Sequence, residues 1–171
     1  MTLEEAIKTA IDYENKVFAT YQEAEQKAKD PVGKRVFGVL AKEEKGHIDY
    51  LNHCLSEWKK TGKLTIASLD TVIPSQDRIT AGLAAMKEKV TEKKQLSSEE
   101  VEYLQKAIEA EQTTSGFYKK MVAELDHEGQ ALFARFVEIE EGHLAIVRAE
   151  MDSVQGLGYW FDVPEWQFQD G

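Results

Sequence analysis

The sequence predicts an all-helical protein, built as an antiparallel four-helix bundle. Four long segments carry apolar residues at the three- and four-residue spacing of amphipathic helices. Only 3 of the 171 residues are proline, and 42% are hydrophobic, which is enough for one sizeable core. The two halves of the chain also repeat one pattern of acidic, histidine and aromatic residues. These observations predict two duplicated helical hairpins.

The first hairpin is predicted from two pairs of residues that typically begin helices. Thr2, with Glu5 three residues later, has the pattern of a capping box. Asp30 followed by Pro31 is typical of an N-cap and a first helical position. The short connection between the two helices makes them antiparallel neighbours. The predicted helices span residues 2–29 and 30–60.

The second hairpin is predicted in the same way. Ser97 with Glu100 is a second capping-box pattern, and Asp126 is a suitable N-cap for the last helix. Gly156 and Gly158 are typical of a helix end. The predicted helices span residues 97–125 and 126–156.

A long crossover is predicted at residues 62–96, between the two hairpins. Gly62 is typical of the position just after a helix, and one helix is expected from about Gln76 to Thr91. A helix of nearly thirty residues is about 40 Å long, and a linker of this size can travel that length. One such crossover between two hairpins permits a ferritin-like topology. We therefore expect one domain over residues 1–156.

An aromatic tail is expected at residues 157–171. It contains Trp160, Phe161, Trp166 and Phe168. Such side chains could pack onto the bundle or onto a second copy of the chain, or they could form a contact surface for another partner. Packing is the interpretation we favour.

The internal repeat places acids and histidines on the predicted core faces. Glu14 followed by Tyr21 matches Glu111 followed by Tyr118, and one Glu-x-x-His motif in each half matches the other. This spacing puts the acid and the histidine on one face of a helix, one turn apart. Each predicted core face is apolar above and below these residues. The candidate metal ligands are Glu14, Glu44, His47, Glu111, Glu140 and His143.

Four carboxylates in one core layer require neutralisation, because burying one ionised carboxylate costs several kcal/mol. Two divalent cations would balance four glutamates, and two neutral imidazoles complete the ligand set without further charge. Known four-helix bundles use this same ligand set to hold two iron or two manganese ions. Ligands rich in oxygen favour iron or manganese over structural zinc.

The alternative to a metal site is an ordinary helix surface. A single Glu-x-x-His pair in an acidic helical protein is usually solvated. Two copies on core faces, each accompanied by a core glutamate on the preceding helix, favour the metal site. Glu43, Glu109 and Glu141 fall off the core faces, so we expect them to be solvated or to lie behind the ligands.

Charge and composition argue against nucleic-acid binding, disulfides, a signal peptide and a membrane span. A net charge of −10 disfavours nucleic-acid binding, since a phosphate backbone would be repelled. Cys54 is the single cysteine, so no intrachain disulfide forms and a reducing cytoplasm is the expected compartment. The acidic amino-terminal segment lacks the apolar region of a signal peptide, and no apolar run is long enough to cross a membrane.

The candidate ligands and their spacing resemble the rubrerythrin branch of the ferritin-like superfamily, over nearly the whole chain. The closing segment 160–165 is also similar to tails of rubrerythrin-like proteins. The resemblance implies that Glu44 and Glu140 bridge two metal ions. It implies one ion held by Glu14 with His47 and the other by Glu111 with His143. Rubrerythrins reduce hydrogen peroxide at such a site, and related ferritins oxidise Fe(II).

Two features depart from the rubrerythrin pattern. The chain has no Cys-x-x-Cys pairs and so no rubredoxin domain, which implies an external electron donor such as a rubredoxin-type protein. Thr114 stands where rubrerythrin has a further glutamate, so the ligand set is closer to the symmetric pattern of bacterioferritin. The resemblance implies a small oligomer, and a homodimer is expected.

Three functions are consistent with this sequence. The first is a di-iron redox enzyme that reduces hydrogen peroxide or dioxygen, in which Tyr21 and Tyr118 donate hydrogen bonds to carboxylates or supply an electron. The two tyrosines could equally be core aromatics whose hydroxyls need a partner. The second function is iron sequestration or storage. The third is a metal-stabilised bundle without catalysis, acting as an interaction module.

Overall fold

The structure is a computed structural model that describes residues 1–90 and 98–167. Within those residues the chain forms helices and no strand. The helices are α1 (Leu3–Lys27), α2 (Pro31–Thr61), α3 (Gln76–Glu88), α4 (Ser98–Glu124), α5 (His127–Leu157) and α6 (Val163–Gln167). The prediction of an all-helical protein is confirmed.

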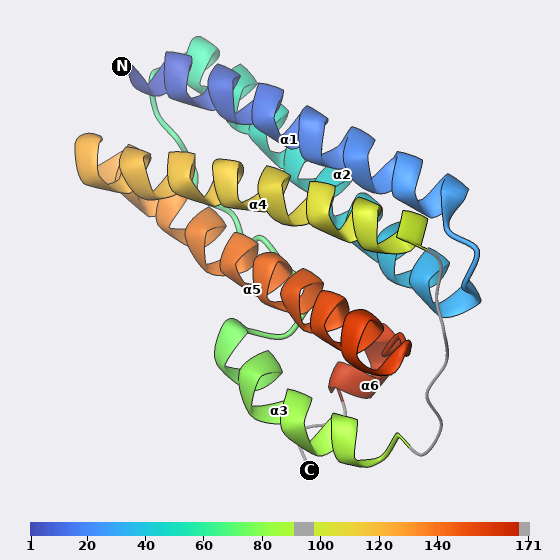
Figure 1. Cartoon of the computed structure of the whole chain (residues 1–171). Coiled ribbons are helices and arrows are strands. Elements are labelled where there is room, and N and C mark those ends of the chain that lie inside the picture. Colours follow the sequence, from blue (N-terminus) through green and yellow to red (C-terminus); the bar gives the residue numbers. More distant parts are fainter. Residues whose placement is uncertain (91–97, 168–171) are drawn as a thin grey trace.

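The four long helices pack side by side, as Figure 1 shows. Helix α1 packs against α2, α4 packs against α5, and α1 also contacts α4. The short α3 packs along α5 on the outside of this group. The chain therefore places the two long helix pairs against each other, and the crossover carries α3.

The helix ends follow most of the sequence signals. Thr2 and Glu5 form the predicted capping box, and the Asp30 side chain accepts hydrogen bonds from the first turn of α2. Gly62 ends α2 with a φ of 69°, in the left-handed region that glycine adopts most easily. Asp126 occupies the N-cap of α5, but its side chain makes no capping hydrogen bond. Asp126 is therefore the N-cap residue, as predicted, but it does not cap the helix through its side chain.

The predicted end of the crossover helix at Thr91 and the predicted start of the third long helix at Ser97 lie outside the described residues. The capping box proposed at Ser97 therefore also lies outside them. The Glu100 side chain has another contact that the sequence did not suggest. Its Oε1 accepts hydrogen bonds from the backbone N–H groups of Lys29, at 3.1 Å, and Asp30, at 2.8 Å. Glu100 thus fastens the start of α4 to the loop between α1 and α2.

Two apolar clusters occupy opposite ends of the long helices. One contains Tyr21 and Phe37, and the other contains Tyr118 and Phe133. On each long helix the candidate ligands lie between the stretches that supply the two clusters. The acid and histidine layer is therefore enclosed by apolar packing on both sides.

The aromatic tail packs onto the helices. Trp160, Phe161 and Trp166 are buried. The buried carboxylate of Glu150 accepts hydrogen bonds from the Phe161 backbone N–H, at 3.1 Å, and the Trp166 indole N–H, at 3.0 Å. Burial raises the pKa of Glu150 well above its ordinary value. Phe168 lies outside the described residues.

Specific contacts hold the crossover against α2 and α5. The Arg135 guanidinium donates to the Leu69 carbonyl at 2.7 Å. Glu57 accepts a hydrogen bond from the Thr65 backbone N–H at 3.1 Å. The carbonyl of Pro74 lies so close to Gly142 that a Cβ at residue 142 would be 2.9 Å from it. Gly142 therefore permits the close approach of the crossover to α5.

This contact predicts opposite effects for two matched glycine substitutions. Gly142→Ala would press a methyl group against the Pro74 carbonyl, and we expect a loss of about 1–3 kcal/mol of unfolding free energy. Gly46 precedes the histidine of the other half and has no atom within 4 Å of a built Cβ. Gly46→Ala should stabilise the protein by about 0.5–1 kcal/mol, because alanine favours helices. Urea unfolding measures both, and equal effects of the two substitutions would contradict the role of Gly142.

In the described part of the chain, no helix has the length and apolar character needed to cross a membrane.

Candidate metal centre

The structure brings together the side chains that the internal repeat singled out. Helices α1 and α4 each supply one glutamate, and α2 and α5 each supply a glutamate and a histidine one turn later. Every one of them is buried, with at most 1% of the residue exposed. They are Glu14, Glu44, His47, Glu111, Glu140 and His143.

The four candidate glutamates form a carboxylate layer across the long helices. The Nδ1 atoms of both histidines point into this layer. His47 Nδ1 lies 3.1 Å from Glu44 Oε2 and 3.0 Å from Glu140 Oε1. His143 Nδ1 lies 2.8 Å from Glu44 Oε1. The two imidazole rings are stacked, with centroids 5.5 Å apart and an interplanar angle of 19°. Both rings therefore present the same nitrogen to the acids.

Four-residue groups on either side of the layer have the composition of two cation sites. Within each group, one donor atom per residue lies within 4.8 Å of all the others. Glu44 and Glu140 belong to both groups, which is the arrangement that shared ligands require. One group is Glu14, Glu44, His47 and Glu140, and the other is Glu44, Glu111, Glu140 and His143.

Each of the two tyrosines donates a hydrogen bond to the unshared glutamate of the other half. The Tyr21 hydroxyl of α1 donates to Glu111 Oε1 of α4 at 2.5 Å, and the Tyr118 hydroxyl of α4 donates to Glu14 of α1. Burial raises the pKa of both tyrosines well above its ordinary value, and the neighbouring carboxylates raise it further. The two hydroxyls therefore keep their protons and act as donors to the unshared glutamates.

The carboxylate layer perturbs its own ionisation. Burial and the neighbouring Glu14 carboxylate raise the pKa of Glu44, and the same two causes raise the pKa of Glu140. Burial also raises the pKa of Glu14, but its hydrogen bonds with Glu44, His47 and Tyr118 and the charge of His47 together outweigh burial and lower the pKa. The layer therefore retains protons near neutral pH unless a cation replaces them.

The two histidines respond to the same acids. Burial lowers the pKa of His47 and of His143, but the surrounding carboxylates outweigh burial and raise it well above the ordinary value. For His47 the largest of these contributions comes from Glu44, and for His143 it comes from Glu140. Negative charge in the layer thus attracts positive charge, either as a proton or as a metal ion.

Unpaired polar atoms in the layer match the donors that a cation needs. Buried oxygens of Glu14, Glu111 and Glu140 have no hydrogen-bond partner, although Glu140 Oε1 lies 3.0 Å from His47 Nδ1. No lysine or arginine is buried among the described residues. Unpaired buried atoms of this kind are costly, and metal coordination would satisfy them. The donor set therefore fits a pair of divalent cations, and these groups could hold a metal ion.

Glu43 contacts a histidine of the centre, and the sequence did not single it out from the other off-face glutamates. Its carboxylate Oε2 lies 2.5 Å from His143 Nε2, the ring nitrogen that faces away from the acids. Burial raises the pKa of Glu43, but the hydrogen bond and charge of His143, together with the donors Thr71 and Val72, outweigh burial, and the pKa falls to about 2. Glu109, in contrast, is exposed, and Glu141 pairs with Lys119 at 2.9 Å. Of the three off-face glutamates, Glu43 alone lies behind a histidine of the centre.

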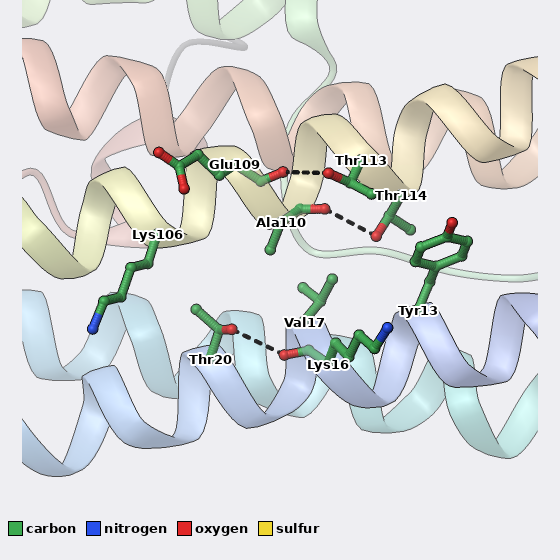
Figure 2. Close-up of a pocket in the computed structure, with 9 residues that line it drawn as sticks. All are labelled: Tyr13, Lys16, Val17, Thr20, Lys106, Glu109, Ala110, Thr113 and Thr114. Carbon is green, nitrogen blue, oxygen red and sulfur yellow. Dashed lines mark hydrogen bonds between the residues drawn. The ribbon is translucent and has the colours of Figure 1, made fainter.

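A groove of about 370 Å³ runs between α1 and α4 (Figure 2), and none of the six candidate ligands lines it. Val17 and Thr114 form part of its lining and are buried, each one helical turn after Glu14 or Glu111. The Thr114 hydroxyl donates to the Ala110 carbonyl of its own helix at 3.0 Å, so the hydroxyl is already paired. The groove is thus lined by residues one helical turn after each unshared glutamate.

The cysteine and the other two histidines belong to neither four-residue group of the centre. Cys54 is buried in an apolar cluster, and burial raises the pKa of its thiol to about 11. His53 and His127 are exposed.

No family model matches the chain, and neither a curated protein nor a solved structure matches it. Its function is therefore inferred from the geometry of the centre.

Proposed function

We propose that the protein is a non-haem di-iron oxidoreductase that reduces hydrogen peroxide or dioxygen, on a ferritin-like four-helix bundle of the rubrerythrin type. One observation carries the proposal: two buried groups of three glutamates and one histidine share Glu44 and Glu140. Such a layer is very unfavourable without cations, and iron suits its oxygen-rich ligands, as manganese also does.

In this proposal the two shared glutamates would help to hold both ions. Glu14 and His47 complete one position, and Glu111 and His143 complete the other. Two ferrous ions held there would supply one electron each to hydrogen peroxide, whose reduction to two water molecules takes two electrons and two protons. The net charge of −10 favours the approach of cations to the chain.

The chain's own residues orient the unshared ligands and exclude water. Tyr21 and Tyr118 donate to Glu111 and Glu14 and so keep each carboxylate in one orientation. Apolar clusters enclose the layer along the helices, and the crossover packs against α5 at Gly142. The groove between α1 and α4 is the route we propose for a small oxidant.

Stopped-flow oxidation of the Fe(II)-loaded protein tests the reaction. We expect peroxide to oxidise the bound Fe(II) faster than it oxidises free Fe(II) under the same conditions. An equal rate, with peroxide and with dioxygen, would exclude the redox proposal and leave iron sequestration as the better explanation. Turnover would also need an external electron donor such as a rubredoxin-type protein.

The tyrosine hydroxyls are predicted to matter for this rate. Tyr118→Phe removes the donor to Glu14 and Tyr21→Phe removes the donor to Glu111. Because such supporting contacts typically change activity or metal affinity 10- to 100-fold, we expect about that loss in the oxidation rate. Tyr50→Phe is the control, since the Tyr50 hydroxyl donates to the Ala67 carbonyl of the crossover instead. Unchanged rates for all three variants would mean that Tyr21 and Tyr118 are core aromatics only.

Two further proposals concern assembly and the alternative functions. A homodimer in the cytoplasm fits the expected class of enzyme, whereas iron storage requires a large hollow assembly. Light scattering separates these, because a dimer excludes cage storage. The interaction module is less well supported, since the aromatic residues Trp160, Phe161 and Trp166 are buried within the chain.

A further inference from the structure

The two halves of the carboxylate layer differ at the residue that precedes the glutamate of each Glu-x-x-His motif. In α2 the residue before the glutamate of Glu-x-x-His is Glu43, and in α5 the matching residue is Ile139. Ile139 is buried in an apolar cluster, whereas the Glu43 carboxylate contacts the layer. The repeat therefore supplies an acidic partner behind one half of the centre only.

That partner acts on His143. The Glu43 carboxylate lies 2.5 Å from His143 Nε2, while His143 Nδ1 faces Glu44 at 2.8 Å and Glu111 at 3.6 Å. A hydrogen bond from Nε2–H to a carboxylate fixes the tautomer that leaves Nδ1 free as a metal donor. It also fixes the ring orientation and makes Nδ1 a stronger donor.

His47 lacks the equivalent contact. Its Nδ1 faces the acids in the same way, but its Nε2 is buried and has no hydrogen-bond partner. From α5, Phe136 packs edge-on against this ring with centroids 5.4 Å apart, and His143 stacks on it. A Glu43 oxygen lies within 4.8 Å of a ring nitrogen of each histidine, but among the described residues it makes no hydrogen bond with His47 Nε2. The His47 ring therefore lacks the hydrogen-bonded carboxylate that supports His143.

Glu43 is itself held by the crossover. Thr71 Oγ1 donates to Glu43 Oε2 at 2.6 Å, and the Val72 backbone N–H donates to Glu43 Oε1 at 2.6 Å. The carboxylate that supports His143 is thus oriented by two donors from the crossover before any ion arrives. Such support of a ligand by fixed neighbours is what prearranges a metal site.

We propose that Glu43 is a positioning residue that makes the two ion positions unequal, so that the Glu111–His143 position binds the first divalent cation more tightly than the Glu14–His47 position. The inference rests on the proposed metal centre and adds an order of filling to it. Contacts behind a ligating histidine typically change metal affinity 10- to 100-fold, which sets the expected difference between the two positions.

Anaerobic calorimetric titration with Fe(II) tests the order of filling in the unmodified chain and in two ligand variants. We expect two binding steps, with the tighter step lost in Glu111→Gln and retained in Glu14→Gln. These variants are matched, since each glutamate belongs to one position and accepts one tyrosine hydrogen bond. Two equal steps, or loss of the tighter step in Glu14→Gln, would overturn the inference and leave the metal centre intact. Absence of any binding would instead overturn the metal centre.

A second set of variants tests Glu43 directly. Glu43→Ala should weaken the tighter step about 10- to 100-fold and leave the weaker step unchanged. Glu43→Gln should retain part of the affinity, since its amide oxygen can still accept from His143. Glu57→Ala is the control, because Glu57 holds the crossover at Thr65 and belongs to none of the acid and histidine groups of the centre. An equal loss in both steps, or a loss as large in Glu57→Ala, would show a purely structural role. If Glu43→Ala fails to fold, the ligand variants still decide the order of filling.

Discussion

Replacing Glu140 by glutamine is expected to abolish the binding of both metal ions while leaving the metal-free protein at least as stable as the unmodified chain. Glu140 belongs to both four-residue groups, so its loss removes a ligand from each position. In the metal-free protein the same change removes one acid from a layer in which burial raises the pKa of Glu140 well above its ordinary value. A residue that serves only the fold would not combine these two effects.

Thermal unfolding with and without Fe(II) measures this combination. At free ion about 100 times the dissociation constant, each bound ion contributes about 2.7 kcal/mol. A chain of this size gains about 2–4 °C per kcal/mol, so two ions should raise the Tm by about 10–20 °C. We expect that increase in the unmodified chain and none in Glu140→Gln. Glu138→Gln is the control on the same helix, since Glu138 pairs with Arg135 at the surface. An increase of the same size in Glu140→Gln would contradict the shared-ligand assignment.

Replacing Trp166 by alanine is expected to destabilise the protein by about 3–5 kcal/mol, because truncation of a buried tryptophan loses its apolar contacts and leaves a cavity. Trp166 is 2% exposed, packs edge-on against Phe161, and donates its indole N–H to the buried Glu150 carboxylate. The substitution therefore also leaves Glu150 with one donor fewer. Urea unfolding of the metal-free protein gives the difference directly.

The control for this prediction is Trp58→Ala, because Trp58 is only half-buried near the end of α2. Its loss should cost distinctly less than the loss of Trp166. A tail that merely rests on the surface would give less than about 1 kcal/mol for Trp166→Ala. That result would favour the contact-surface interpretation of the tail.

The pattern of apolar residues predicted much of the fold because helical periodicity is a local property. The first helix was expected over residues 2–29 and runs from Leu3 to Lys27, and the chain leaves the helix where Ala28 is extended. The last was expected over residues 126–156 and ends at Leu157, before a left-handed Gly158. Capping and glycine signals act within one turn, so the sequence locates such ends closely.

Contacts between distant segments were not predictable in this way. Glu43 was expected to be solvated or to lie behind the ligands, and nothing local distinguishes it from Glu109, which is exposed. Its contact with His143 depends on how α2 meets α5. The buried Glu150 beneath the tail likewise depends on the fold of residues 157–167. The ligand candidates were predictable because the same spacing of acids and histidine occurs in both halves of the chain. Comparison of the two halves also shows that Ile139 stands where the first half has Glu43.

The most direct test of the metal centre is the anomalous scattering of a crystal soaked anaerobically with Fe(II), measured at the iron absorption edge. We predict two peaks in the buried layer, one beside Glu14 and His47 and the other beside Glu111 and His143, with Glu44 and Glu140 between them. No peak in this layer, or peaks only at surface carboxylates, would contradict a buried metal centre.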